Sequence, residues 1–184
     1  MNANDNMRSW FNDDELYNKY LNFPDKVPFN IVKFIEQNIP SIKLIESNIA
    51  KKGISGFIKQ EDNGDIFICV HQFDHPNRKR FTIAHELGHY FRHRSQIKEG
   101  FVDGIGSGVM PRGSSENNIS TAEMEANQFA AEVLMPENAF KNIHTKKNGN
   151  ITEIAEYFIV SEAATYTRAK MLGLLYSDNI TYFM

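Results

Sequence analysis

The stretch FTIAHELGHYFRH, Phe81–His93, gathers three histidines and one glutamate in a segment whose apolar residues have helical spacing. These apolar residues recur at every fourth position: Ile83, Leu87 and Phe91. In an α-helix, residues four apart lie one turn apart on the same face, so His85 and His89 can direct both imidazoles at a single ion. The segment therefore predicts a metal-binding helix at the centre of the fold.

Glu86 follows His85 directly and projects about 100° away from it, which places it beside an ion rather than on it. This is the arrangement of the H-E-x-x-H zinc hydrolases, in which the glutamate is the general base. The same pattern also occurs on ordinary helices, so the pattern alone leaves a metal-free polar stripe open. Gly88 favours the metal interpretation, because a glycine inside a helix costs about 1 kcal/mol and indicates close approach by another backbone or a ligand.

A catalytic zinc ion takes three protein ligands and keeps a fourth position for water, so a third ligand is required. On a straight helix His93 lies roughly 12 Å beyond His85, too far for both to reach one ion. We therefore expect His93 at the rim of the cleft or behind the ligands, with helix capping as the alternative.

The segment 121–135, TAEMEANQFAAEVLM, is predicted to be a second helix and to supply the third ligand. Three of its residues fall within roughly 40° of Glu123 on a helical projection: Asn127, Ala130 and Leu134. Glu125 falls on the far side with Glu132, where solvent is the expected neighbour. We predict Glu123 as the third ligand, with a buried structural carboxylate as the alternative.

The remaining pattern predicts an α+β fold in which a small antiparallel sheet packs on the helical core. A helix is expected from Pro28 to about Pro40, and apolar runs rich in β-branched residues follow at 42–47, 54–60 and 65–71. The Asn63-Gly64 pair favours a tight hairpin between the last two runs. The edge strand of this hairpin is predicted to pair with an extended substrate.

Composition indicates a globular chain and gives no sign of a nucleic-acid or membrane partner. The chain has 184 residues, of which 41% are hydrophobic, and a formal net charge of −3, which offers no electrostatic attraction to anionic polymers or lipid surfaces. Its one cysteine, Cys69, lies in an apolar run and cannot form an internal disulfide. No apolar run approaches the ~20 residues of a membrane span, and the N-terminus lacks a secretory pattern. We expect the protein in the cytosol.

Two separated motifs resemble a known family. RFTIAHELGHYFRH, 80–93, together with EMEANQFAAEVLMP, 123–136, is similar to the paired signature of the ImmA/IrrE metallopeptidases, which have a gluzincin-like zinc site. The resemblance implies His85, His89 and Glu123 as zinc (Zn2+) ligands and Glu86 as the catalytic base.

The resemblance also implies a function. Family members are cytosolic endopeptidases, and some cut or inactivate helix-turn-helix repressors in stress response or mobile-element regulation. Others are toxin-side partners of such repressors, so a non-cleaving binding partner or toxin–antitoxin component is the alternative. Candidates for oxyanion stabilisation or ligand support are His93, Tyr90, Asn127 and Arg168. The Gly- and Ser-rich stretch 104–120 is expected to be a long loop, and its length departs from the family's pattern.

We expect three parts: an N-terminal extension at 1–27, a metallopeptidase domain at 28–136, and a C-terminal part at 137–184 that resembles a helix-turn-helix. The extension is expected to be loosely attached, with a short helix over Asp13–Leu21. In the C-terminal part, Asn150 and Ser161 are predicted N-caps and Gly173 a helix end. Its charged residues sum to −1 over 151–175, so direct DNA binding is unlikely and a protein-docking role is expected.

Overall fold

The computed structural model describes residues 14–21, 27–50, 53–95, 97, 101–103 and 121–175. The elements are α2 (Asp14–Leu21), α3 (Ile31–Asn38), β1 (Ile42–Ser47), β2 (Gly56–Gln60), β3 (Ile66–His71), α4 (Pro76–Arg92), β4 (Phe101–Asp103), α5 (Thr121–Leu134), α6 (Glu137–Lys146), α7 (Ile151–Phe158) and α8 (Glu162–Met171). Within these segments, no helix has both the length and the apolar character needed to cross a membrane. The predicted loop at 104–120 lies outside the described residues.

The sheet is mixed rather than antiparallel, and the predicted α+β class is confirmed. Its strand order is β1-β3-β2-β4. The hairpin strands β2 and β3 are antiparallel as predicted, but β1 runs parallel to β3, with Ile42 opposite Ile66. A strand's pattern of apolar residues does not specify the direction of its neighbour, so this pairing could not be predicted from the sequence.

Neither strand of the hairpin forms an edge of the sheet. β3 lies between β1 and β2, and β4 pairs with β2 from Gly56 to Ile58. At the end of β2 that β4 does not cover, the backbone nitrogen of Gln60 donates to the carbonyl oxygen of Ile97 at 3.1 Å. The prediction that an edge of this hairpin receives a substrate is therefore wrong, because β1 pairs with β3 and β4 pairs with β2.

The hairpin turn is longer than the two-residue turn that Asn63-Gly64 favours. Gly64 has φ +89°, but Asn63 is not among the described residues with positive φ, which a type I′ turn would require. Instead, the side-chain oxygen of Asn63 accepts from the backbone nitrogen of Asp65 at 3.0 Å. The pair therefore marks the turn without setting its length.

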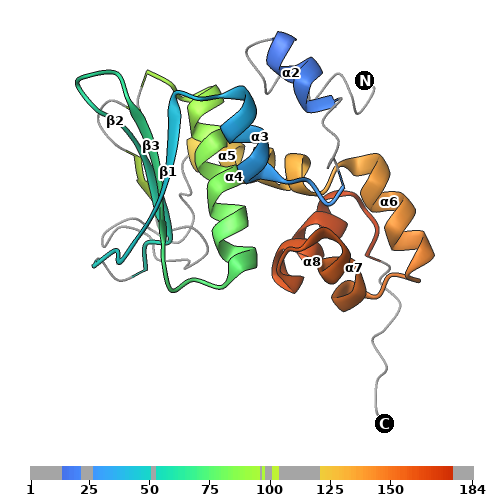
Figure 1. Ribbon diagram of the computed structural model, residues 1–184. Coiled ribbons are helices and arrows are strands. Elements are labelled where there is room, and N and C mark those ends of the chain that lie inside the picture. The colour runs from blue at the N-terminus through green and yellow to red at the C-terminus, as the bar shows by residue number, and fades with distance from the viewer. Residues whose placement is uncertain are drawn as a thin grey trace.

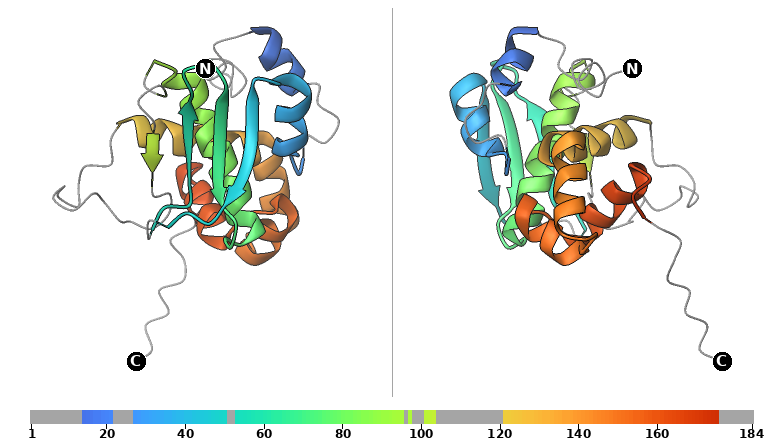
Figure 2. Two further views of the ribbon diagram at one scale, coloured as in Figure 1. Left: turned by 60° about the vertical axis from the view of Figure 1, so that its left-hand side comes forward. Right: turned by 90° about the vertical axis from the view of Figure 1, so that its right-hand side faces the viewer.

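Helix α4 lies between the sheet on one side and the remaining helices on the other (Figure 1, Figure 2). Every residue from Thr82 to Phe91 is buried. On the sheet side, a Cβ at Gly56 of β2 would collide with the side chain of Thr82. Helix α4 therefore packs against both the sheet and other helices, which explains why apolar and polar side chains alike are buried along it.

The N-terminal helix α2 is part of the core and not loosely attached. Leu16, Tyr17 and Tyr20 are buried, and the Tyr20 ring packs edge-on against Phe29 with centroids 5.0 Å apart. The Tyr20 hydroxyl donates to the carbonyl oxygen of Val133 in α5 at 3.4 Å. The short helix was predicted, but its packing was not, because a helix of eight residues has too few apolar positions to indicate a buried face.

The predicted caps of the C-terminal helices are confirmed. Asn150 accepts from the backbone nitrogen of Glu153, Ser161 accepts from that of Ala164, and Gly173 has φ +66°. The hydrophobic core continues from α2 through α8. The division between a metallopeptidase domain at 28–136 and a C-terminal part at 137–184 therefore stays a prediction. Buried side chains of both parts belong to the same hydrophobic core.

Candidate metal centre

Three side chains converge on one point between α4 and α5. Nε2 of His85 lies 2.9 Å from Nε2 of His89. The Glu123 carboxylate faces both rings, with Oε2 3.3 Å from His85 Nε2 and Oε1 3.2 Å from His89 Nε2. Both histidines are fully buried, whereas the Glu123 side chain is 20% exposed. These are the three residues that the sequence predicted as metal ligands, and the structure brings them together as a group that could hold a metal ion.

Close packing of the two helices brings the ligands together. A Cβ added at Gly88 would lie 3.0 Å from the Cα of Ala126 and 3.2 Å from its carbonyl oxygen. Glycine and alanine therefore allow the helix backbones to approach, as the position of Gly88 between the two histidines predicted. Glu123, in the first turn of α5, then reaches across to the histidine face.

The far nitrogen of each ligand histidine has its own hydrogen-bond partner. Nδ1 of His85 lies 3.0 Å from Oδ1 of Asn127, and Nδ1 of His89 lies 3.1 Å from Nδ1 of His93. An amide oxygen only accepts, so His85 donates its Nδ1–H to Asn127 and keeps the lone pair on Nε2. This is the tautomer that a metal ligand requires.

The geometry fits a small divalent cation. In tetrahedral coordination with bonds of about 2.05 Å, neighbouring ligand atoms are about 3.3 Å apart, close to the 2.9 to 3.3 Å found here. Two nitrogen lone pairs and a carboxylate that face one another repel unless a cation lies between them. Two imidazoles and one carboxylate match the donors of catalytic zinc sites.

Burial favours the neutral form of the His89 imidazole. Its pKa is lowered mainly by loss of solvent, while the contact with the Glu123 carboxylate acts in the opposite direction and the nearby His85 lowers the pKa further. A neutral ring offers the lone pair that a metal needs.

Glu86 is completely buried next to this cluster. By helical phase Glu86 lies about 160° from Gly88, which contacts α5, whereas His85 and His89 lie about 60° and 100° from Gly88. Glu86 therefore points away from α5 and is not one of the three clustered residues.

Glu125 does not face solvent alone, and the prediction that it lies away from the site is wrong. Its Oε2 atom lies 3.1 Å from Nε2 of His93 and 3.6 Å from Nε of Arg92. The helical projection was centred on Glu123, whereas the contact with α4 is centred near Ala126, about 60° away. Glu125 therefore lies at one border of the contact and Glu123 at the other.

Tyr90 and Arg168, the remaining candidates for oxyanion stabilisation, each have a hydrogen-bond partner outside the ligand cluster. The Tyr90 hydroxyl accepts from Nη1 of Arg94 at 2.8 Å. Arg168 is buried and donates two parallel bonds to Glu132, at 2.9 and 2.8 Å, and a third to the carbonyl oxygen of Met135. Glu132 is roughly 13 Å along α5 from Glu123, so the structure does not bring Arg168 to the ligand cluster.

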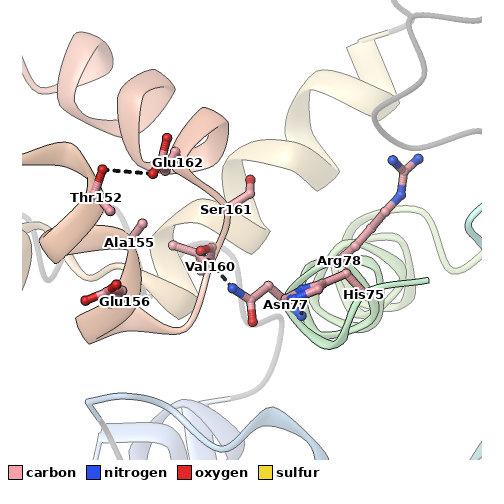
Figure 3. Close-up of a pocket in the computed structure, with 9 residues that line it drawn as sticks. All are labelled: His75, Asn77, Arg78, Thr152, Ala155, Glu156, Val160, Ser161 and Glu162. Atoms are coloured by element: carbon pink, nitrogen blue, oxygen red, sulfur yellow. Dashed lines mark hydrogen bonds between the residues drawn. The ribbon is translucent and has the colours of Figure 1, made fainter. Parts of the chain in front are cut away.

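A separate hollow of about 350 Å³ lies at the other end of α4, against α7 and the start of α8 (Figure 3). The α4–α7 pocket is lined by His75, Asn77, Arg78, Thr152, Ala155, Glu156, Val160, Ser161 and Glu162. Asn77 donates across it to the carbonyl oxygen of Val160 at 3.0 Å. Arg78 extends away from it and donates to Ser55 at 2.7 Å. Its α4 residue Asn77 lies roughly 12 Å along the helix from His85, so the pocket is distinct from the ligand cluster.

Comparison with known proteins identifies a family for most of the chain. The family model for Peptidase_M78, described as the IrrE N-terminal-like domain, matches residues 38–170. None of the curated proteins matches the sequence. Among solved structures, the chain is similar to a Mycobacterium tuberculosis transcriptional regulator, with a TM-score of 0.58 and 13% identity over 92% of this chain. The chain spans about half the length of that regulator, 52%. At this identity the likeness shows the fold alone.

Proposed function

The chain belongs to the Peptidase_M78 family of IrrE N-terminal-like domains, and on this premise we propose that it is a zinc-dependent endopeptidase of the cytosol. The observation that supports this most directly is the convergence of His85, His89 and Glu123, whose ligand atoms all lie within 4.8 Å of one another. Their donor types and their burial suit zinc.

The roles of the residues follow from their positions. A bound zinc ion would polarise a substrate carbonyl and lower the pKa of water. Glu86, buried beside the ligands, would take the proton of the attacking water and pass it to the leaving amine. Asn127 holds His85 in the tautomer that binds metal, and the buried surroundings of both histidines exclude competing water.

We propose that the substrate is a helix-turn-helix repressor, in line with the family resemblance, and that cutting it serves stress response or mobile-element regulation. A cytosolic protease needs a second contact to avoid damaging other proteins. The surface of α7 and α8 offers exposed apolar side chains at Tyr157, Ile159 and Tyr166. Exposed carboxylates at Glu156 and Glu162 border the α4–α7 pocket and would attract a basic segment of the repressor.

Direct DNA binding is not supported by this surface. Arg168, one of its two basic residues, is 2% exposed and is paired with Glu132. Lys170 remains exposed, but a single cation neutralises too little phosphate for useful affinity.

The decisive experiment compares the wild type with Glu86→Gln. Zinc content is measured by elemental analysis, and cleavage of the proposed substrate, taken as a helix-turn-helix repressor encoded near this gene, is followed by mass spectrometry of the fragments. The wild type should bind about one zinc ion per chain and cut the repressor, and Glu86→Gln should keep the metal and lose activity by about 10²–10⁴-fold. An intact repressor that binds tightly to the wild type would instead favour the non-cleaving partner.

The docking surface has its own matched test. Glu156→Lys should weaken binding of the repressor and raise KM, whereas Glu46→Lys, a carboxylate on the exposed part of β1, should not. Equal behaviour of the two variants would remove α7 from the substrate contact. Cleavage of casein as fast as the repressor would contradict the specificity.

A further inference from the structure

A chain of hydrogen bonds leads from the ligand His89 toward the surface. Nδ1 of His89 lies 3.1 Å from Nδ1 of His93, and Nε2 of His93 lies 3.1 Å from Oε2 of Glu125. The side chains become more exposed along this chain, from 0% for His89 to 9% for His93 and 33% for Glu125. It thus connects the buried centre with a carboxylate that solvent can reach.

The carboxylate gives the chain a direction. An ionised carboxylate only accepts hydrogen bonds, so His93 donates its Nε2–H to Glu125. The 3.1 Å contact between the Nδ1 atoms of His93 and His89 needs one donor and one acceptor, and a neutral ring that donates from Nε2 is the acceptor. Its Nδ1 then has a lone pair and accepts from Nδ1–H of His89. This leaves the lone pair of His89 on Nε2, which faces His85 and Glu123.

We propose that His93 and Glu125 are positioning residues that fix the tautomer and ring orientation of His89 for metal binding. The inference rests on the proposed function, because it takes His89 to be a zinc ligand. It adds two residues, neither of which is a ligand or a base, to the residues that determine zinc affinity. Metal-binding histidines commonly depend on such partners for their orientation.

The two ligand histidines differ in this support. His85 has one link to an amide on α5, Asn127, at 3.0 Å. His89 has two links, and the second ends at a carboxylate that also lies near the partly exposed Arg92. A change at Glu125 should therefore reach the metal through two hydrogen bonds, while His85 is unaffected.

Zinc affinity, measured by competition with a chromogenic chelator, tests the proposal without any activity assay. His93→Leu removes the acceptor and should weaken zinc binding by about 10–100-fold. His93→Asn keeps an acceptor oxygen near the position of Nδ1 and should retain most of the affinity. Glu125→Ala should weaken binding less than His93→Leu. Glu46→Ala, which removes an exposed carboxylate paired with Lys79, is the matched control and should have no effect.

A double-mutant cycle separates a relay from two independent effects. If Glu125 acts through His93, the double variant of His93→Leu and Glu125→Ala should bind zinc no more weakly than His93→Leu alone. Additive losses would overturn the proposal. Urea denaturation of the metal-free variants checks that each is folded.

Nitrogen NMR of the zinc-loaded protein detects the tautomers themselves. The His93 ring should have its proton on Nε2 and the His89 ring on Nδ1. A proton on Nδ1 of His93, or a loss of affinity in His93→Asn as large as in His93→Leu, would contradict the proposal. If the wild type binds no zinc, the proposed function fails with it. If the wild type binds zinc and the variants bind equally well, this inference alone fails.

Discussion

The two ends of α5 use the same side chain, glutamate, for opposite purposes. At the N-terminal end, the carboxylate oxygens of Glu123 lie 3.3 and 3.2 Å from the Nε2 atoms of His85 and His89. At the C-terminal end, Glu132 accepts two parallel bonds from the guanidinium of Arg168. The first arrangement is a set of metal-type donors that suits a bound cation, whereas the second contains its own positive charge.

The difference teaches how burial and partner type decide what a carboxylate does. Arginine stays charged at any physiological pH, so the pair of Glu132 and Arg168 is closed and joins α5 to α8. Imidazole nitrogens and carboxylate oxygens are donors that suit zinc, so Glu123 beside His85 and His89 can form a metal site. Removing Glu123 should therefore affect the metal, and removing the ion pair should affect stability.

Glu123→Ala should have the largest effect on the metal centre. Loss of a direct ligand should weaken zinc binding by more than the roughly 10–100-fold expected for a supporting residue. The stability of the metal-free protein should change little, because the repulsion among the three donors is relieved. Competition with a chelator and urea denaturation measure the two quantities, and a stable zinc complex in this variant would overturn the ligand assignment.

Arg168→Ala should affect stability most strongly. It leaves the carboxylate of Glu132, whose side chain is 13% exposed, without its partner, and breaking a buried pair costs about 3–5 kcal/mol. Zinc affinity of the folded protein should be unchanged. Lys141→Ala is the control, since its pair with Glu137 is on the surface and should contribute at most about 1 kcal/mol. Similar unfolding free energies for the two variants would contradict the contrast between the ends of α5.

Gly88→Ala tests the contact that brings the two helices together. The added methyl would lie 3.0 Å from the Cα of Ala126, where the backbone cannot move aside easily. Overpacking of this kind costs about 1–3 kcal/mol, against a gain of about 1 kcal/mol in helix propensity. We expect a net loss of stability together with weaker zinc binding. A variant more stable than the wild type, measured by thermal unfolding, would show that α4 and α5 can separate without cost.

Ser161→Ala should have the smallest effect, confined to the C-terminal helices. The hydroxyl accepts from the backbone nitrogen of Ala164 at 3.1 Å, and loss of such a cap costs about 1 kcal/mol. Zinc affinity should not change, because Ser161 caps α8, whereas the three clustered residues are on α4 and α5. Urea denaturation with and without zinc measures both, and a fall in affinity would connect α8 to the metal centre.

Local patterns determined much of this molecule. The spacing of His85, Glu86 and His89 sets their relation on one helix before any tertiary contact forms. Gly88 indicated close backbone approach because a glycine inside a helix lowers the stability of that helix. The caps at Asn150 and Ser161 could be predicted because each side chain bonds a backbone nitrogen three residues on. The helical phase of α5 also selected Glu123 as the candidate third ligand, since a ligand must lie on the face of α5 that contacts α4.

Tertiary structure decided what depends on partners distant in sequence. The parallel pairing of β1 with β3, the burial of α2 and the position of β4 beside β2 arise from contacts that local periodicity does not specify. Glu125 was assigned to solvent because a helical projection gives angles within one helix but not the line along which two helices touch. That line passes near Ala126, so both Glu123 and Glu125 reach α4, and only the packed pair of helices determines which carboxylate faces the ligand nitrogens and which faces His93.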